Sequence, residues 1–380
     1  MKVAIFGSGL MGSTIAMDLV KSKQVDQVTI YDVDRRRLKD LTSRVSSSKL
    51  EAKAHDVRRS NQTANVLKKV DVGIGALPHG LSEYAIHSTI SARVNFVDLI
   101  FGWRFGQAEI NSACKRRAIT IIPACGLAPG LTNILAMKAA EQMDRVDEVH
   151  IKVGGIPEKP KPPLNYRIVF SFQAVLEEYL RKARIIRNRR TVDVQALSGL
   201  EMINFPPVGR CECFYTDGLS TLVRTIRKVR EMDEKTIRWP GHAEQIRTLI
   251  DCGLLDTKPV TYHNQAISPR DFVSATLSEK LALGRERDLT LLRVEVSGKR
   301  NGETTRYRYQ MVDHYDSRHH VTSMARTTAF PCSIAAQMLA SERIQQKGLV
   351  PPEIAFRADL RDELLGYVEE RGMNIDSRHT

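Results

Sequence analysis

A glycine-rich stretch, GSGLMG, opens the chain between a short apolar run and a helical pattern. Gly7 permits a tight turn, Gly9 lets the backbone approach a pyrophosphate, and Gly12 lets a helix pack closely on a strand. Leu10 and Met11 lie at the start of that helix, whose unpaired N–H groups attract phosphate. The stretch therefore predicts a dinucleotide-binding turn.

Asp32 ends a second apolar run, QVTIY, twenty positions beyond Gly12. Its carboxylate can accept hydrogen bonds from both hydroxyls of an adenosine ribose and would repel a 2′-phosphate. This predicts NAD rather than NADP as cofactor. Two alternatives stay open: Asp32 could cap the helix that starts before Arg35, or Arg35 or one of the two arginines after it could pair with a 2′-phosphate. We count Arg35 among the expected cofactor contacts.

Alternating strand and helix patterns surround these residues. VAIF at residues 3–6 is long enough for a buried strand, and the glycine turn leads into a helical pattern at 13–21. Further strands are expected at 70–77, 94–100 and 118–123, with helices at 81–91 and 108–117. This order predicts the α/β class, with an N-terminal Rossmann-type, doubly wound parallel sheet.

Ligands of such sheets bind beyond the carboxyl ends of the strands. Ala76, Leu77 and Pro78 lie at the end of the expected 70–77 strand and directly after it, and they are expected to contact the cofactor. His79 comes next and titrates near neutral pH, so we consider it a candidate catalytic base. Asp98, near the end of the expected 94–100 strand, is the rival base. The structural alternatives are an exposed loop histidine and a capping aspartate.

Composition excludes several classes of protein. The chain has 380 residues, 42% of them hydrophobic, which is enough for two domains. Its six cysteines form no CxxC pair, so we expect neither a metal site nor disulfides. The net charge of +13 lies in short clusters without interleaved aromatic residues, which argues against nucleic-acid binding. There is no long apolar segment and no signal-peptide pattern, so we expect a cytoplasmic protein without a membrane span.

Several short motifs occur together in one order along the chain. They are FGSGLMG, APGLTN at 128–133, GGIP with PPLNY at 154–166, EEY at 177–179, IIRN at 185–188, WPGHAE at 239–244 and VTSMAR at 321–326. In this order and spacing the chain resembles the saccharopine dehydrogenase family, and within it lysine 6-dehydrogenases most closely. The resemblance covers nearly the whole length.

The resemblance implies a dinucleotide domain interrupted by a second, α+β domain with a large mixed sheet. The expected domains are 1–130 for the dinucleotide, 131–322 for substrate and oligomerisation, and 323–380 as a C-terminal helical segment that returns to the first domain. Period-two patterns at 289–298 and 305–313, joined by GKRNGE, agree with a strand hairpin in the second domain. A homodimer or higher homo-oligomer through that sheet is also implied.

The resemblance further implies NAD-dependent oxidation of the side-chain amine of an amino acid. For L-lysine the product would be 2-aminoadipate 6-semialdehyde, with release of ammonia. Ala124 stands where lysine 6-dehydrogenases usually have an acidic residue, so other substrates stay open. One alternative is a saccharopine or carboxynorspermidine type reductase acting on a secondary amine. The other is a dinucleotide-binding protein without turnover.

An amino-acid substrate needs a cation that holds its carboxylate, and arginine does this with a bidentate fork. Arg238 stands just before the WPGH run, where the family likeness is dense; an exposed salt bridge is the alternative. The proline-rich stretch GGIPEKPKPPLNY is too stiff for a flexible linker, so it is either a pocket wall or a rigid connector. The expected substrate contacts are Gly154, Gly155, Tyr166, Tyr179, Arg238 and His242.

Overall fold

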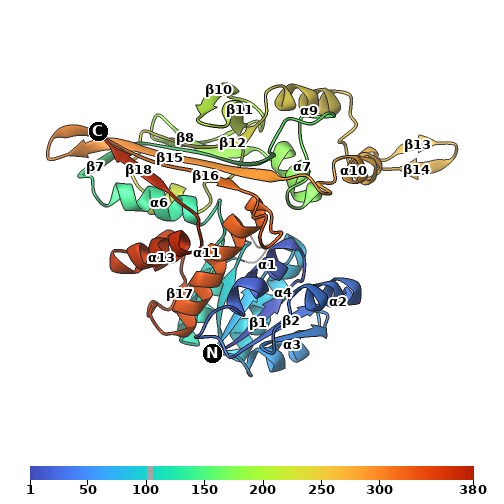
Figure 1. The fold of residues 1–380 in the computed structure, drawn as a ribbon. Helices are drawn as coiled ribbons and strands as arrows, with labels where there is room; N and C mark the ends of the chain where they lie inside the picture. The colour runs from blue at the N-terminus through green and yellow to red at the C-terminus, as the bar shows by residue number, and fades with distance from the viewer. Residues whose placement is uncertain (101–105) are drawn as a thin grey trace. The chain divides into compact units, whose positions relative to one another are not determined.

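The computed structural model describes residues 1–100 and 106–380, which form two compact units, each made of three stretches of chain (Figure 1). Unit 1 comprises Met1–Glu141, Ser220–Thr225 and Ala325–Asn374. Unit 2 comprises Gln142–Leu219, Ile226–Met324 and Ile375–Thr380. The expected α/β class is confirmed, with a parallel sheet in unit 1 and a mixed sheet in unit 2.

Unit 1 is built on a sheet in which every neighbouring pair of strands is parallel. The strand order is β17-β6-β5-β4-β1-β2-β3. Four consecutive residues of β1, Val3 to Phe6, are fully buried, as expected for a strand covered on both faces. The strands are β1 (Lys2–Phe6), β2 (Gln27–Asp32), β3 (Leu50–Ala54), β4 (Val72–Gly75), β5 (Asn95–Asp98), β6 (Thr120–Ile122) and β17 (Gly348–Leu349).

Unit 1 also contains helices, several of which alternate with its strands along the chain and lie around its sheet (Figure 1). They are α1 (Leu10–Leu19), α2 (Arg35–Arg44), α3 (Ser60–Leu67), α4 (His79–Ala92), α5 (Gln107–Arg116), α6 (Leu131–Ala140), α8 (Leu222–Thr225), α12 (Pro352–Ala355) and α13 (Asp359–Glu370). Helix α11 (Ser323–Ala340) belongs to unit 1 from Ala325 onward. The sequence patterns did not predict β3, because LEAKA contains no β-branched or aromatic residue.

Unit 2 contains a large mixed sheet with the strand order β10-β11-β12-β7-β15-β16-β18, to which β8 and β9 are added beside β12. Strand β7 pairs parallel to β12 and antiparallel to β15. The strands of this mixed sheet are β7 (Arg145–Pro157), β8 (Ala183–Arg187), β9 (Arg190–Val194), β10 (Glu201–Phe205), β11 (Gly209–Tyr215), β12 (Glu231–Arg238), β15 (Asp288–Arg300), β16 (Glu303–His314) and β18 (Asp376–His379). A separate small sheet pairs β13 (Val260–Tyr262) with β14 (Gln265–Ile267). The helices are α7 (Phe172–Leu180), α9 (His242–Asp251) and α10 (Pro269–Lys280).

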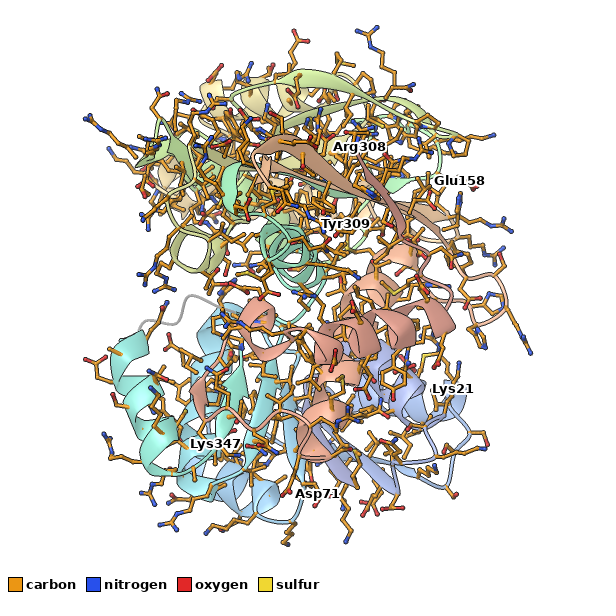
Figure 2. The ribbon with its side chains drawn as sticks, turned by 90° about the vertical axis from the view of Figure 1, so that its left-hand side faces the viewer. Lys21, Asp71, Glu158, Arg308, Tyr309 and Lys347 are labelled. Atoms are coloured by element: carbon orange, nitrogen blue, oxygen red, sulfur yellow. The ribbon has the colours of Figure 1, made fainter. Side chains whose placement is uncertain are left out.

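The hairpin predicted from GKRNGE joins β15 to β16. Asn301 and Gly302 have positive φ angles of 51° and 82°, as a tight hairpin turn requires. Along β16, successive side chains point to opposite faces, so Tyr309 is buried while Arg308 on the other face pairs with Glu295 (Figure 2). The chain ends in β18, which pairs with β16 in this sheet rather than with the C-terminal helices.

Alternation along β12 also divides its side chains between the two faces of the sheet. Asp233 and Lys235 point to one face, and Glu234, Thr236 and Arg238 point to the other. Helices α7 and α9 contribute an apolar cluster, together with Tyr166 and Phe214, against this second face. This cluster positions the polar residues that the sequence assigned to substrate binding.

Candidate functional site

The glycine turn between β1 and α1 is closely packed at two of its three glycines. A Cβ at Gly7, whose φ is +102°, would lie 2.3 Å from the Ala76 carbonyl oxygen. A Cβ at Gly12 would lie 1.9 Å from the Gly7 carbonyl oxygen. Gly9, at the N-cap of α1, has no atom within 4 Å of its Cβ position and no side-chain cap. The turn therefore needs Gly7 and Gly12 for its own packing, and Gly9 is open toward a ligand at the helix N-terminus.

Asp32 ties the glycine turn to β2. Its Oδ2 accepts hydrogen bonds from Ser8 N at 2.6 Å and Ser8 Oγ at 2.9 Å, and its Oδ1 accepts from Asp34 N at 2.9 Å. Burial raises the pKa of Asp32, but these hydrogen bonds outweigh it, so the pKa lies below its usual value and the carboxylate is ionised. The helix cap of α2 is Asp34, which accepts from Arg36 N and Arg37 N, so the capping alternative does not apply to Asp32.

The other expected cofactor contacts lie around this turn. Leu10 and Met11 begin α1, and Leu10 is exposed. Ala76 donates its N–H to Phe6 O at 2.9 Å, and its own carbonyl oxygen lies against Gly7. Leu77 also reaches the Gly7 position, and Pro78 is the N-cap of α4. Arg35 is the exposed first residue of α2.

The two candidate bases have different surroundings. His79 is exposed at the first position of α4. Asp98 is fully buried at the end of β5, where one oxygen accepts from the Ser82 hydroxyl and the other from Ile100 N at 3.0 Å. These contacts join β5 to α4, which favours the structural alternative for Asp98. A catalytic role for either residue stays a prediction.

In unit 2, Arg238 lies at the end of β12 and starts a chain of hydrogen bonds. Its Nε donates to the Tyr179 hydroxyl at 2.7 Å, since a guanidinium can only donate. The Tyr179 hydroxyl lies 2.9 Å from His242 Nε2, and His242 Nδ1 lies 2.7 Å from Leu164 O. A carbonyl oxygen can only accept, so His242 carries its proton on Nδ1 and accepts the Tyr179 proton on Nε2. Every proton in this chain is thereby assigned.

His242 is neutral in this arrangement. It is fully buried, and burial lowers its pKa from 6.5 to about 3, assisted by the positive charge of Arg238. His242 and Tyr179 thus hold each other and Arg238, whereas the sequence assigned them directly to substrate. Their expected contact with substrate stays a prediction.

Arg238 is buried without an acidic partner. It is 2% exposed, and among the residues that the structure describes it makes no ion pair. The rings of Tyr166 and Tyr179 lie 4.9 Å and 5.6 Å from its guanidinium carbon, within cation–π range. The alternative of an exposed salt bridge is therefore wrong. A buried guanidinium without a contacting carboxylate is costly. The negative charge of Glu178 acts on Arg238 electrostatically, without an ion pair.

The proline-rich segment contacts this cluster through its last residues. Leu164 O accepts from His242, Tyr166 contributes its ring, and Asn165 Nδ2 donates to Pro240 O at 3.0 Å. These contacts show that the segment packs on the Arg238 cluster, and its role as a pocket wall stays a prediction. Gly154 and Gly155 lie within β7 and allow close packing of protein on protein. A Cβ on Gly154 would lie 2.3 Å from Ile237 O, and one on Gly155 would lie 2.4 Å from Met324 Cε.

Four polar residues beside Arg238 were missed by the sequence analysis. Thr236 and Glu234 precede Arg238 on the same face of β12, Thr216 follows β11, and Glu178 precedes Tyr179 on α7. Hydrogen bonds join them in a row. The period-two pattern of EMDEKTIR would have placed Glu234 and Thr236 with Arg238.

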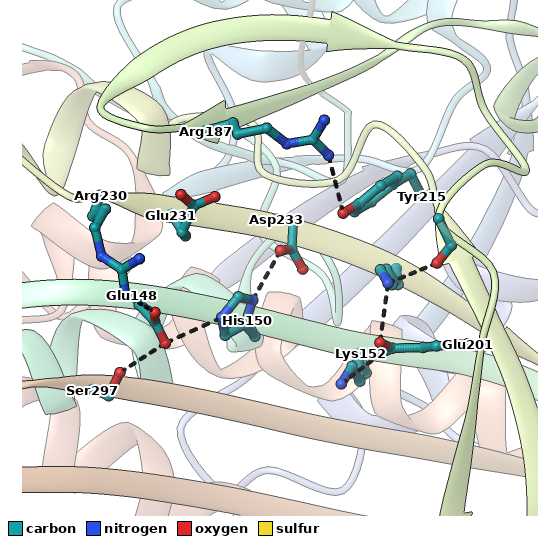
Figure 3. Close-up of polar contacts among 12 residues, drawn as sticks. Glu148, His150, Lys152, Arg187, Glu201, Tyr215, Arg230, Glu231, Asp233 and Ser297 are labelled. Carbon is teal, nitrogen blue, oxygen red and sulfur yellow. Dashed lines mark hydrogen bonds and ion pairs between the residues drawn. The ribbon is translucent and has the colours of Figure 1, made fainter.

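The opposite face of the sheet also carries charged residues, several of which form ion pairs (Figure 3). His150 Nδ1 lies 2.8 Å from Asp233 Oδ2, and its Nε2 lies 3.6 Å from Glu148 Oε2. Lys152 pairs with Glu201 at 2.7 Å. His150 and Lys152 are thus compensated by acidic neighbours, whereas Arg238 makes no ion pair with any residue that the structure describes.

The remaining features of the described residues are their possible metal ligands, the lengths of their helices and their cysteines. Within residues 1–100 and 106–380, no three His, Cys, Asp or Glu side chains are grouped as metal ligands. None of the helices in the described ranges has the length and apolar character needed to cross a bilayer. The cysteines are unpaired, and burial raises the pKa of Cys125 to about 12, so its thiol is un-ionised.

Comparison with known proteins agrees with the fold. Residues 3–122 match the family model described as the saccharopine dehydrogenase NADP binding domain, and residues 126–373 match the saccharopine dehydrogenase C-terminal domain. A saccharopine dehydrogenase [NADP(+), L-glutamate-forming] from Saccharomyces cerevisiae is 21% identical over 448 residues, covering 97% of each chain. The mitochondrial alpha-aminoadipic semialdehyde synthase of Bos taurus is 21% identical over 454 residues. The present chain spans about half the length of that relative, 48%, and is itself covered completely.

A solved structure shows the same fold. The apo saccharopine dehydrogenase (L-Glu forming) from Saccharomyces cerevisiae superposes with a TM-score of 0.83 at 19% identity, covering 100% of this chain and 99% of the yeast chain. Together the two family models span most of the sequence. The family resemblance stated from the motifs is thereby confirmed, whereas the likeness to lysine 6-dehydrogenases is not tested, and the chain belongs to the saccharopine dehydrogenase family.

Proposed function

We propose that this chain is a nicotinamide-dinucleotide-dependent oxidoreductase that oxidises a carbon–nitrogen bond of an amino acid whose carboxylate is held by Arg238. One observation carries the proposal: Arg238 is a buried guanidinium without an acidic partner among the described residues, oriented by Tyr179 and enclosed by Tyr166. Such a site suits a bound carboxylate, because the pair would compensate both charges away from water.

The residues of unit 1 fit a nicotinamide dinucleotide. Gly9 leaves room at the N-terminus of α1, and Asp32 provides an ionised acceptor twenty positions after Gly12. When bound, the dinucleotide accepts the hydride. We propose NAD as the preferred form because the charge of Asp32 opposes a 2′-phosphate. The description of the matched domain and the name of the yeast relative favour NADP instead, and the exposed Arg35 could serve it.

Two amine substrates are candidates. The motif likeness favours the side-chain amine of L-lysine, which would give 2-aminoadipate 6-semialdehyde and ammonia. The relatives' names favour a secondary amine of the saccharopine type, with L-glutamate as a product. Ala124, in place of the acidic residue of lysine 6-dehydrogenases, favours this second candidate because a carboxylate that could orient a primary amine is absent there.

Product analysis separates these candidates. Purified protein is incubated with L-lysine or saccharopine and with NAD⁺ or NADP⁺, while absorbance of the reduced dinucleotide, ammonia and glutamate are measured. Ammonia from lysine supports the first candidate, and glutamate from saccharopine supports the second. Dinucleotide binding without turnover of either substrate would refute the proposed oxidoreductase and support a binding protein.

Assembly and location are further proposals. By likeness to the family we propose a homodimer or higher homo-oligomer formed through the sheet of unit 2, acting in the cytoplasm on a small-molecule substrate. Sedimentation of the purified protein measures the assembly, and a monomer at working concentration would refute it.

A further inference from the structure

A continuous row of hydrogen bonds joins two glutamates in unit 2. Thr236 Oγ1 lies 2.6 Å from Glu178 Oε1, and Thr216 Oγ1 lies 2.8 Å from Thr236 Oγ1. Thr216 Oγ1 also lies 2.8 Å from Glu234 Oε2. The row therefore runs from Glu178 on α7, through two hydroxyls, to Glu234 inside the sheet.

Counting protons shows that one of the two glutamates is protonated. Three hydrogen bonds need three protons, and each threonine hydroxyl supplies one. If both carboxyl groups were ionised, two oxygens in the row would face each other at hydrogen-bond distance without a proton. The third proton must therefore come from a carboxyl group. The protonated carboxyl group then donates to the nearer threonine hydroxyl, and that hydroxyl donates to the second threonine hydroxyl. The second hydroxyl donates to the ionised carboxylate at the other end of the row.

The surroundings of the two glutamates place this proton on Glu234. Glu234 is 3% exposed and makes no ion pair with any described residue, so its ionised form would be a buried, uncompensated charge. Burial, and then the negative charge of Glu178, raise its pKa well above 4.5. The negative charges of Asp217 and Asp233 also raise the pKa of Glu234. A Cβ on Gly218 would lie 2.5 Å from its carboxyl carbon, so this glycine makes room for the group.

Glu178 has the opposite surroundings. It is half-buried, and it accepts the Thr236 proton through Oε1. It also interacts electrostatically with Arg238, Tyr166 and Tyr179. Arg238 is the cation of this group, so the negative charge is favoured on Glu178. The row ends in an ionised carboxylate beside the expected anchor of the substrate.

We propose that Glu178 and Glu234 hold one proton between them through Thr216 and Thr236, and that Glu178 is the base that accepts the proton of the secondary ammonium group of a saccharopine-type substrate, whose nitrogen is bonded to a carbon that bears a carboxylate. The second half of this proposal rests on the proposed function. In the step, the N–H bond of the ammonium breaks, an O–H bond forms on Glu178, and the electron pair stays on nitrogen. Because Glu234 already holds a proton, Glu178 stays ionised and ready to accept one.

Infrared spectroscopy tests the shared proton without cofactor or substrate. The carbonyl stretch of a protonated carboxyl group is separate from that of a carboxylate, and the wild type minus Glu234→Gln difference spectrum at neutral pH isolates the contribution of Glu234. We expect a protonated-carboxyl band in this difference and none in the wild type minus Glu177→Gln difference. Glu177 is the matched control, since it is the exposed neighbour of Glu178 on α7. A difference showing only carboxylate bands would overturn the shared proton.

Thr216→Val tests whether the proton lies in the row. The carboxyl of Glu234 would lose its hydrogen-bond acceptor, so its carbonyl band is expected to shift in frequency while remaining in the protonated region. An unchanged band would show that Glu234 donates elsewhere. Melting temperatures of the variants show whether the fold is retained.

Kinetics test the base. Glu178→Gln should lower kcat roughly 10²- to 10⁴-fold, the usual range for loss of a general base, while the affinity for the dinucleotide is unchanged. Glu177→Gln should leave kcat within about twofold. If Glu178→Gln kept its kcat while the Arg238 variants had a lowered kcat/KM for the amino acid, the assignment of Glu178 as the base would be wrong and the proposed function would stand. If no amino acid were turned over at all, the proposed function would fail, and the infrared result would still decide the shared proton.

Discussion

Replacing Arg238 by Met should change stability and substrate binding in different ways. The side chains are of similar length, and Met brings no charge into the buried site. The substitution removes two hydrogen bonds, to the Tyr179 hydroxyl at 2.7 Å and to Ile237 O at 2.8 Å. Each bond from a charged donor is worth about 1.5–3 kcal/mol. It also removes the cost of burying a guanidinium that has no directly contacting carboxylate, which is several kcal/mol. The two effects offset each other, so we expect the free energy of unfolding to change by no more than about 1–2 kcal/mol.

Substrate binding has no such compensation. In Arg238→Met, the substrate carboxylate would lose its charge-assisted pair with the guanidinium, which is worth on the order of 1.5–3 kcal/mol. At about 1.4 kcal/mol per tenfold, kcat/KM should fall roughly ten- to hundredfold. The dinucleotide affinity should stay unchanged, because every residue expected to bind it belongs to unit 1.

Arg238→Lys is the informative comparison. It keeps a buried charge but loses the planar fork that reaches Tyr179 and Ile237 together. We therefore expect the Lys variant to be less stable than the Met variant, although Lys is the more conservative change. Its kcat/KM for an amino acid should also fall, with little effect on a diamine that lacks the carboxylate.

Urea unfolding followed by tryptophan fluorescence measures these stabilities. The chain has two tryptophans, Trp103 and Trp239, and Trp239 directly follows Arg238 in unit 2. A Trp103→Phe background leaves Trp239 as the reporter. A loss of more than about 3 kcal/mol in Arg238→Met with unchanged kcat/KM would show that Arg238 is structural. Equal losses for diamine and amino acid in Arg238→Lys would place the carboxylate elsewhere.

Three further predictions concern the dinucleotide turn and the buried histidine. Gly9→Val should abolish dinucleotide binding at an unchanged melting temperature, because a Cβ there meets no protein atom. Gly12→Val should instead destabilise unit 1. If calorimetric titration gave Gly9→Val the wild-type affinity for the dinucleotide, the dinucleotide would not bind at this turn. Asp32→Ser should shift the ratio of catalytic efficiencies with NAD⁺ and NADP⁺ toward NADP⁺. If the wild type preferred NADP⁺, Arg35 rather than Asp32 would determine the choice of cofactor. His242 has a folded pKa lowered to about 3, so the unfolded chain binds its proton first and stability is lost as the pH falls below 6.5. By pH 5 this contribution is about 2 kcal/mol, so urea unfolding should show the wild type losing about 2 kcal/mol more than His242→Gln between pH 7 and pH 5.

The dinucleotide turn could be predicted from sequence because its parts are adjacent along the chain. Gly7, Gly12 and the strand before them lie within twelve residues, and Asp32 follows one helix and one strand later. The helix cap was harder to assign. Asp32 and Asp34 both precede α2, and only their side-chain hydrogen bonds in the structure show that Asp34 caps the helix while Asp32 binds Ser8.

The Arg238 cluster was predictable in its membership but not in its contacts. Tyr179 and His242 were expected near Arg238, yet they bind each other across 63 positions of sequence. Nothing in the local pattern specifies such a pairing. The same holds for Gly154, which looked like a site of close ligand approach and in fact packs on the backbone of β12.

The edge strand β17 has a consequence for folding during synthesis. It pairs with β6 through Gly348 and Leu349, and Thr120 Oγ1 donates to Gln346 O at 2.6 Å, across 226 positions. While the chain emerges from the ribosome, β6 has no neighbour on that side until more than two hundred further residues have been made. An apolar strand edge left open for so long invites pairing with another nascent chain. We therefore expect yield in the cell to depend on chaperones and on translation speed between β6 and β17.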